Sequence, residues 1–174
     1  MFQLPIVTYP TRTFRLDTTH HYADRAFQSL AKQHVPRPRV YGGILQTVHS
    51  DPEQVRYLLV QGRYSGKWSF PKGHSNTGEE PLTCARREIA EETGQDFLPE
   101  PSEYIRIGYG NYYVFLCPYT FLPIPRDTGE IMATAWVTIK EMEHMVLNVD
   151  VNRYYKKKVR ELERLNVCQE ILKI

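Results

Sequence analysis

The chain has 174 residues, of which 41% are hydrophobic, and this is enough for one globular domain with a sizeable core. A formal net charge of +2 is too small to argue by itself for nucleic acid binding. The three cysteines lack C-x-x-C spacing, which argues against both a zinc site and a disulfide framework. No apolar run approaches the ~20 residues of a membrane span. We therefore expect a soluble, intracellular and cytoplasmic protein without a membrane or disulfide partner, and the sequence leaves its oligomeric state open.

Residues 1–36 are expected to form an N-terminal appendage to a domain of residues 37–174. The appendage starts with Pro- and Thr-containing sequence, has one short helix near residues 22–33, and ends in the turn residues VPRPR. Neither part contains an internal repeat or a low-complexity segment.

The first half of the domain is expected to form strands and then a helix. Runs of β-branched and large apolar residues predict strands at 39–47, 56–61 and 68–70. Pro81 suits the first turn of a helix, where its missing N–H costs nothing, and Gly94 suits the position just past a helix end. A helix of about 12 to 14 residues is therefore predicted between them.

The second half is expected to add strands and two more helices. Strands are predicted at 104–109 and 112–120, on either side of Gly110-Asn111, a dipeptide that suits a two-residue hairpin turn. A strand at 131–139, a short helix at 140–144 and a longer helix at 151–165 follow. We expect an α+β fold, an α/β/α sandwich in which a mixed β-sheet lies between helices.

The helix before Gly94 has an unusual distribution of charge. Its apolar residues Leu82, Ala85 and Ile89 recur on one face. The carboxylates of Glu88, Glu91 and Glu92 share the neighbouring face, where glutamates three and four residues apart repel one another. Glu-rich helices are usually solvated, but a bound cation would reverse the sign of this interaction. Mg²⁺ and Mn²⁺ prefer such oxygen ligands together with substrate phosphates.

Glu79 and Arg87 extend this pattern. Arg87 lies four residues before Glu91, so its guanidinium can orient a carboxylate through paired hydrogen bonds. The pattern G-x5-E-x7-R-E-U-x-E-E-x-G, in which U is a bulky aliphatic residue, is matched at all eight fixed positions between residues 73 and 94. This segment resembles the Nudix box. The box ends in a second aliphatic residue where this chain has Gln95, so we expect different local packing after the helix.

The Nudix resemblance implies the same sandwich architecture and a metal-dependent hydrolase. In this family a loop–helix–loop binds divalent metals, and water attacks a pyrophosphate linkage in a nucleoside diphosphate joined to another moiety. By this resemblance, Mg²⁺ or Mn²⁺ would be held by Glu88, Glu91 and Glu92 with help from the Lys72 carbonyl. Arg87 would orient a glutamate.

The sequence around the box, about residues 35–140, resembles the catalytic domain of mRNA-decapping enzymes. The matching stretches are YGGI (41–44), LLVQG (58–62), WSFPKG (68–73), and Glu130-Ile131 followed by AWV (135–137). In the third stretch the Lys72 side chain could aim a cation at phosphate. A glutamate before an apolar strand is usually a solvated loop residue, but the resemblance implies that Glu130 is a metal ligand or general base. Lys72 or Glu130 would act near the leaving group or the water.

Two features depart from the decapping pattern. Decapping enzymes have a lysine after P-K-G, whereas His74 follows here, and P-K-G-H resembles diadenosine-tetraphosphate hydrolases. We therefore expect His74 to contact substrate. Decapping enzymes also carry an all-α regulatory domain ahead of the catalytic domain, and only about 36 residues precede the domain here.

A basic segment near the end of the chain, residues 153–164, offers a second binding surface. Its candidate substrate-binding residues are Arg153, Lys156, Lys157 and Lys158. Such a helix is more often a solvated cover for the core. Alternatively, it could track RNA phosphates while bases stack on Tyr154 and Tyr155, or it could bind a very anionic small substrate such as an inositol pyrophosphate.

Three functions remain open. The favoured hypothesis is a Mg²⁺- or Mn²⁺-dependent pyrophosphohydrolase that acts on a nucleotide-capped substrate, above all the 5′ cap of mRNA, with capped RNA as its partner. The second is a small-molecule Nudix hydrolase that acts on dinucleoside polyphosphates or diphosphoinositol polyphosphates. The third is a binding module without catalysis, which the retention of every acidic position in the box disfavours.

Overall fold

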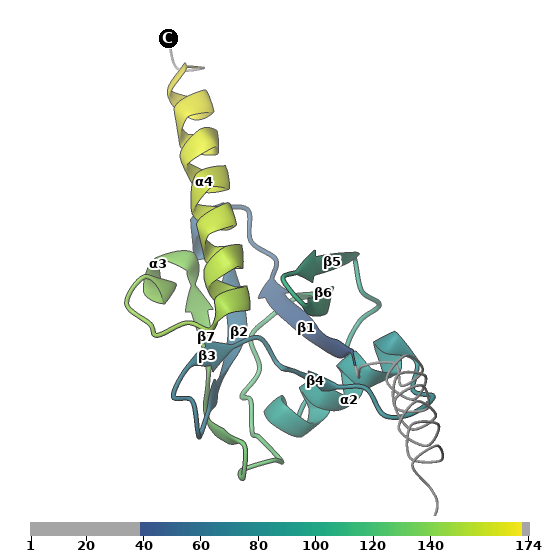
Figure 1. Cartoon of the computed structure of the whole chain (residues 1–174). Coiled ribbons are helices and arrows are strands. Elements are labelled where there is room, and N and C mark those ends of the chain that lie inside the picture. Colours follow the sequence, from purple (N-terminus) through teal and green to yellow (C-terminus); the bar gives the residue numbers. More distant parts are fainter. Residues whose placement is uncertain (1–38, 172–174) are drawn as a thin grey trace, which may run out of the picture. The chain divides into compact units, whose positions relative to one another are not determined.

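The computed structural model describes residues 39–171, so the expected appendage at 1–36 and its helix at 22–33 lie outside the described residues. The elements in chain order are β1 (Val40–Thr47), η1 (Pro52–Gln54), β2 (Arg56–Gly62), β3 (Trp68–Ser69), β4 (Lys72–His74), α2 (Pro81–Thr93), β5 (Glu103–Ile107), β6 (Gly110–Cys117), β7 (Ile131–Thr138), α3 (Ile139–Met142) and α4 (Val149–Ile171). Most strands and helices predicted for residues 39–171 are therefore present (Figure 1).

The sheet is mixed, as predicted. β1 pairs in parallel with β6 along its whole length, whereas β2 pairs antiparallel with β7 and β5 antiparallel with β6. The pairing of β1 with β2 has Gln46 opposite Tyr57. The short strand β4 pairs with β1, and β3 pairs with β2. This register brings the Lys72–His74 segment against the start of β1.

Helices cover both faces of the sheet, which confirms the predicted α/β/α sandwich (Figure 1). Successive residues of β1 point to opposite faces, as the pleat requires. Ile44 packs in a core cluster with residues of α3 and α4, whereas Leu45 packs in a second cluster with Ile89 of α2. The two helical layers are therefore held by the alternating side chains of one strand.

Helix α2 has the limits that its sequence predicts. Pro81 occupies the first turn, and Gly94 ends the helix in the left-handed conformation with φ of 75°. Ala85 and Ile89 are fully buried against the sheet. A Cβ at Gly43 would lie 2.4 Å from the Ile89 Cδ1 atom, so this glycine allows the close approach of helix and strand.

One turn differs from the prediction. The β5–β6 hairpin turns at Gly108-Tyr109 and not at Gly110-Asn111. Gly108 adopts a φ of 62°, and Gly110 and Asn111 belong to β6, where Gly110 lies opposite Val40. The prediction was wrong because long-range pairing with β1 extends β6 to Gly110.

Two other elements differ from the sequence expectation. Residues 72–74 form a strand through pairing with β1, although their sequence has no strand pattern. Helix α4 begins at Val149 and ends at Ile171, so it is longer than the predicted 151–165 helix.

Within the described part of the chain, no helix is both long and apolar enough to cross a bilayer.

Candidate functional site

A cleft of about 710 Å³ lies beside α2 and collects residues from six separate parts of the chain. Its residues come from the start of β1, the β2–β3 loop, the β3–β4 segment, α2, and the segments before β7 and α4. The lining residues are Val40, Gly62, Arg63, Tyr64, Ser65, Lys67, Ser69, Lys72, Gly73, His74, Glu88, Glu91, Glu92, Asp127, Glu130, Ile131 and Asn148. All the predicted metal ligands line this cleft.

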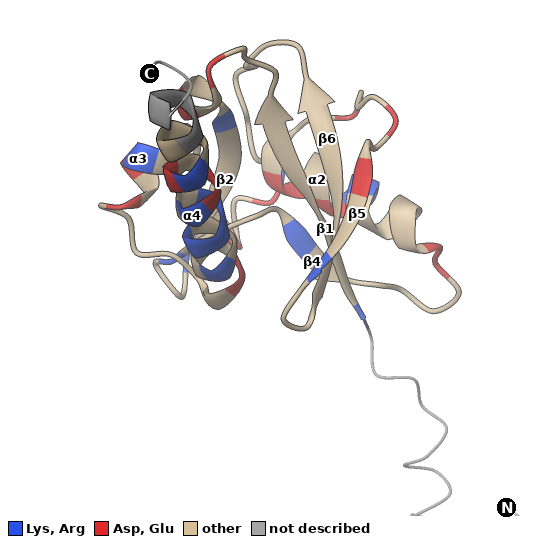
Figure 2. Ribbon diagram, turned by 90° about the horizontal axis from the view of Figure 1, so that it is seen from above, with Lys and Arg blue, Asp and Glu red and all other residues tan. Residues whose placement is uncertain are grey.

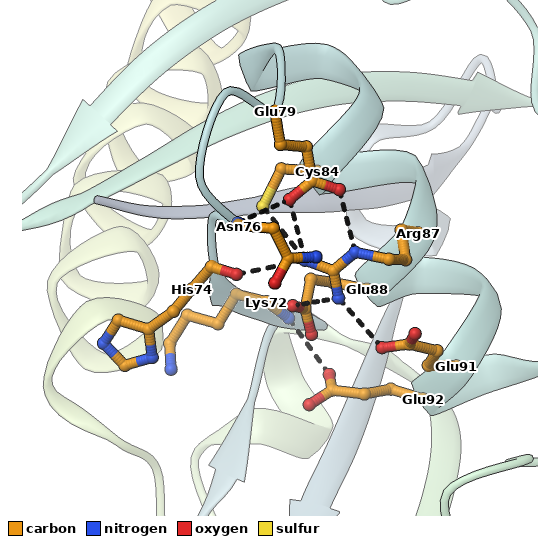
Figure 3. Close-up of polar contacts among 9 residues, drawn as sticks. All are labelled: Lys72, His74, Asn76, Glu79, Cys84, Arg87, Glu88, Glu91 and Glu92. Carbon is orange, nitrogen blue, oxygen red and sulfur yellow. Dashed lines mark hydrogen bonds and ion pairs between the residues drawn. The ribbon is translucent and has the colours of Figure 1, made fainter. Parts of the chain in front are cut away.

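Arg87 is the centre of the hydrogen-bond network on α2 (Figure 3). Its Nε and Nη2 atoms donate to the two carboxylate oxygens of Glu79 at 2.8 and 3.0 Å. Its Nη1 atom donates to Glu88 at 2.6 Å and to Glu91 at 3.0 Å. Nη2 also donates to the His74 carbonyl at 3.0 Å. One guanidinium therefore fixes three carboxylates and the end of β4 in a single arrangement.

The charge on Arg87 changes the protonation of its neighbours. Its hydrogen bonds hold the pKa of Glu79 down at about 2, with help from the Asn76 N–H. Burial raises the pKa of Glu88, although Arg87 opposes this shift. A Cβ at Gly73 would lie 2.2 Å from the Glu88 carboxylate, so a larger residue there would displace this carboxylate from its hydrogen bond with Arg87.

Glu92 has a different environment. Its Oε2 atom accepts the Lys72 backbone N–H at 3.0 Å. Burial raises the pKa of Glu92 to about 8, and the negative charges of Glu88 and Glu130 contribute to this rise. A buried carboxylate with other carboxylates nearby is stabilised in its charged form by a cation. Glu92 is therefore where a positive ion would have the largest effect on ionisation.

The carboxylate oxygens beside the cleft suit a hard divalent cation by type, but they do not converge on one point. Within residues 39–171, no three His, Cys, Asp or Glu side chains are grouped closely enough to hold a metal ion as they stand. Glu88 and Glu91 are instead paired with Arg87. The available ligands are carboxylate oxygens beside a cleft, which is the chemistry that Mg²⁺ and Mn²⁺ prefer. The residues fit such an ion by type and by charge.

Glu130 enters the cleft from the segment before β7, on a turn that sequence reasoning did not identify. The Asp127 Oδ1 atom accepts the N–H groups of Gly129 and Glu130, each at 3.0 Å. The Asp127 N–H donates to the Glu91 carbonyl at 3.0 Å, which ties this turn to α2. The sequence Asp-Thr-Gly-Glu could have indicated the turn, because an aspartate often accepts backbone N–H groups two residues later.

Arg63 holds the same turn from its other side. Its backbone N–H donates to the Glu130 carbonyl at 2.7 Å, and its Nε atom donates to the Thr128 carbonyl at 3.0 Å. The sequence gives no local signal for this contact, since the two residues are far apart along the chain.

Lys72 and His74 both line the cleft. Lys72 uses its N–H to hold Glu92, and His74 uses its carbonyl to accept from Arg87. Their predicted roles toward metal and substrate remain predictions. Gln95, the position that departs from the Nudix box, donates through Nε2 to the Phe97 carbonyl at 2.6 Å. It therefore makes a hydrogen bond within the turn after α2.

The basic residues of α4 lie outside the cleft. Figure 2 shows Lys and Arg gathered along this helix. Lys157 and Lys158 pair with Glu161 at 3.8 and 2.9 Å, and Arg153 lies near Gly108. Tyr154 is buried in the core, in edge-to-face contact with Tyr57 and Phe70, so it cannot stack on a nucleic acid base. That part of the α4 prediction was wrong, and a phosphate-binding role for its four basic residues remains a prediction.

Comparison with known proteins connects this site to one family. Residues 44–158 match the family model described as NUDIX domain. The chain is 46% identical over 132 residues to the m7GpppN-mRNA hydrolase dcap-2 of Caenorhabditis elegans, covering 70% of this chain and 16% of that protein. It is 39% identical over 80 residues to mRNA-decapping enzyme subunit 2 of Arabidopsis thaliana, covering 45% of this chain and 21% of the relative. The predicted resemblance is confirmed, but the chain spans only a small part of these relatives.

Solved structures share the fold at low sequence identity. An Ap4A hydrolase of C. elegans in a binary complex has a TM-score of 0.53 at 16% identity, covering 72% of this chain and 98% of that one. The NUDIX domain of Shewanella oneidensis NrtR complexed with ADP ribose has a TM-score of 0.53 at 18% identity, covering 78% of this chain and 96% of that one. These similarities show the fold alone.

Proposed function

Because the chain belongs to the Nudix hydrolase family, we propose that it is a metal-dependent pyrophosphohydrolase of a nucleotide-capped substrate, with the 5′ cap of mRNA favoured. The observation that carries this proposal is the cleft in which the carboxylates of α2 and Glu130 meet, in a chain 46% identical over 132 residues to a protein named as an m7GpppN-mRNA hydrolase. Relatives named as mRNA-decapping enzymes in yeast and Arabidopsis support the same substrate class.

The carboxylates of Glu88, Glu91, Glu92 and Glu130, with the Lys72 carbonyl, would hold Mg²⁺ or Mn²⁺. Such an ion, when bound, screens the charge of the phosphates and makes water a better nucleophile. Arg87 keeps Glu88 and Glu91 oriented toward the cleft through its hydrogen bonds. Without these bonds the carboxylates would lose their common orientation, and the site would have to order them when substrate binds.

Proton transfer and charge neutralisation fall to three residues of the cleft. Glu92 or Glu130 accepts the proton of the attacking water, since both are carboxylates that line the cleft. The Lys72 ammonium faces the phosphates, where it offsets negative charge that develops on the leaving group. His74 lies at the exposed edge of the same cleft and contacts the part of the substrate beyond the phosphates.

The surface of α4 supports a polymeric substrate. Arg153, Lys156 and Lys157 are exposed, so they are available to the phosphates of an RNA that extends from the cleft. Each such contact releases counterions, so RNA binding would depend on salt concentration. A free cap dinucleotide would not reach this helix, so its binding would depend less on salt concentration.

A small-molecule substrate is the second candidate. It is favoured by His74, which stands where decapping enzymes carry lysine and which lines the cleft. A turnover advantage of more than about tenfold for diadenosine tetraphosphate over capped RNA, about 1.4 kcal/mol in the barrier, would support it. The binding-module alternative is disfavoured because every acidic residue of the site is present, and metal-dependent release of phosphate would eliminate it.

The experiment is a turnover screen of the full chain with Mg²⁺ or Mn²⁺ against capped RNA, free cap dinucleotide, diadenosine tetraphosphate and an inositol pyrophosphate. Glu92→Gln serves as the inactive variant and Glu143→Gln, an exposed residue outside the cleft, as the matched control. We expect capped RNA to be the preferred substrate. Near-normal turnover by Glu92→Gln would overturn the assignment of the site.

A further inference from the structure

The β2–β3 loop, residues 63–67, contributes four residues to the cleft, and no role in metal binding explains them. Arg63, Tyr64, Ser65 and Lys67 all line it. They carry two cationic groups, a hydroxyl and an aromatic ring. This is the combination of groups that recognises phosphates and a stacked base.

Tyr64 is the most informative of these residues, because it is an aromatic residue that is 90% exposed. Within the described residues, Phe97, Tyr109 and Tyr119 are also strongly exposed, but they do not line the cleft. A tyrosine in water contributes nothing to the core, whereas the same ring at the edge of a cleft offers a flat apolar surface to a ligand.

The loop that carries Tyr64 is held in one conformation by its own backbone. Gly62 N–H donates to the Lys67 carbonyl at 3.1 Å, and Gly66 N–H donates to the Gly62 carbonyl at 2.8 Å. Gly66 adopts a φ of 64°, which closes the turn, and the Gln61 amide donates to its carbonyl at 2.9 Å. A ring on such a loop loses less conformational freedom when it binds a ligand.

Arg63 connects this loop to the catalytic side of the cleft. Because its N–H binds the Glu130 carbonyl and its Nε binds the Thr128 carbonyl, the loop and the Glu130 turn are held together. Tyr64 follows Arg63 directly in sequence. The backbone at Tyr64 therefore lies next to a segment that is fixed against the Glu130 turn.

We infer that the β2–β3 loop is a nucleotide subsite, in which Tyr64 stacks on a base and Lys67 faces a phosphate of the substrate. This inference rests on the proposed function, since the subsite binds the part of the substrate that extends from the pyrophosphate. The cleft of about 710 Å³ has the size of pockets that hold a nucleotide-sized ligand. The stacked base belongs either to the cap or to a nucleotide of the RNA.

The test compares Tyr64→Ala and Tyr64→Phe with Tyr109→Ala, an equally exposed tyrosine outside the cleft. Binding of three probes to the full chain with Mg²⁺ is measured: cap dinucleotide, a capped 20-nucleotide RNA, and inorganic tripolyphosphate, which has no base. Every variant is made in the Glu92→Gln background, which prevents turnover, and is compared with Glu92→Gln alone, so that any loss of metal binding is common to all of them. We expect Tyr64→Ala to weaken binding of cap dinucleotide or capped RNA about tenfold and to leave tripolyphosphate within about twofold. Tyr64→Phe and Tyr109→Ala should change the affinity for each of the three probes by no more than about twofold.

If Tyr64→Ala loses affinity equally for cap dinucleotide and capped RNA, the stacked base belongs to the cap or to the first nucleotide. If it loses affinity for capped RNA alone, the base lies further along the RNA. The inference is overturned if Tyr64→Ala binds every probe normally, or if it loses tripolyphosphate to the same extent, since the cleft itself would then be disturbed. Normal turnover of capped RNA by Tyr64→Ala at limiting substrate, with Glu92→Gln inactive, would overturn the subsite and leave the proposed function standing. Lack of nucleotide binding by the wild-type chain would overturn both.

Discussion

Helices α2 and α4 are both rich in charge, yet the structure uses their charges differently. On α2, Arg87 gathers three carboxylates beside the cleft, and burial of Glu92 raises its pKa to about 8. On α4, Lys157 and Lys158 pair with a glutamate of their own helix, outside the cleft. A run of charged residues therefore indicates a chemical site only when other segments fold against it and remove part of its water.

The largest expected effect is on turnover when Glu92 is made neutral. Glu92→Gln keeps the size of the side chain but removes the charge that a divalent cation would need. We expect kcat to fall about a thousandfold or more, about 4 kcal/mol in the barrier, while the circular dichroism spectrum stays unchanged. Glu143→Gln, the matched control, should have wild-type kinetics. Loss of activity in both variants would show that the effect is not local to α2.

The same substitution should stabilise the metal-free protein at alkaline pH. Glu92 has a pKa of about 8 in the folded chain and about 4.5 when unfolded, so the folded state retains a proton that the unfolded state releases. Its contribution to stability is present below about pH 4.5 and is lost as pH rises through 8. Glutamine does not titrate, so Glu92→Gln loses no stability as the pH rises. In EDTA at pH 8.5 its free energy of unfolding should therefore exceed the wild-type value by about 2–4 kcal/mol.

Chemical denaturation at pH 4.5 and pH 8.5 measures this difference. The gap between the two proteins should shrink at the lower pH, and excess Mg²⁺ should restore wild-type stability at the higher pH if the ion binds there. A gap independent of pH would contradict the raised pKa of Glu92.

Arg87→Lys tests whether the forked geometry matters as well as the charge. Lysine cannot reproduce the paired hydrogen bonds to Glu79 together with those to Glu88 and Glu91. We expect kcat to fall about 10–100-fold and the unfolding free energy to fall by about 1–2 kcal/mol. Arg106→Lys, an exposed arginine of β5, should change neither quantity measurably. If both variants have the same kcat and unfolding free energy, the hydrogen bonds of Arg87 do not organise the site.

The smallest effects are expected on α4. Lys157→Ala removes an exposed side chain whose pair with Glu161 is 3.8 Å long, so stability should change by less than about 1 kcal/mol. If this helix contacts RNA, affinity for capped RNA should fall about two- to threefold, and the slope of log K against log salt should decrease by about 0.7. Binding of free cap dinucleotide should stay constant. Fluorescence anisotropy at several salt concentrations measures both ligands, and an unchanged slope would make α4 a cover for the core alone.

The sequence by itself determined the parts that depend on local chemistry. Pro81 and Gly94 define the limits of α2, because one suits a helix start and the other adopts the left-handed conformation at its end. The spacing of the glutamates on this helix put them on one face, and the order of residues identified the Nudix box. The basic composition of α4 was equally readable.

Only the tertiary structure decided which distant residues meet. Glu130 reaches the cleft on a turn that Arg63 of the β2–β3 loop and Glu91 of α2 hold by hydrogen bonds, so segments far apart in sequence position it. The same limit explains the misplaced hairpin turn, which pairing with β1 determines, and the burial of Tyr154, which packing against Phe70 determines. Local propensity carries no information about such contacts, since they depend on strand register and on how the two helical layers pack on the sheet.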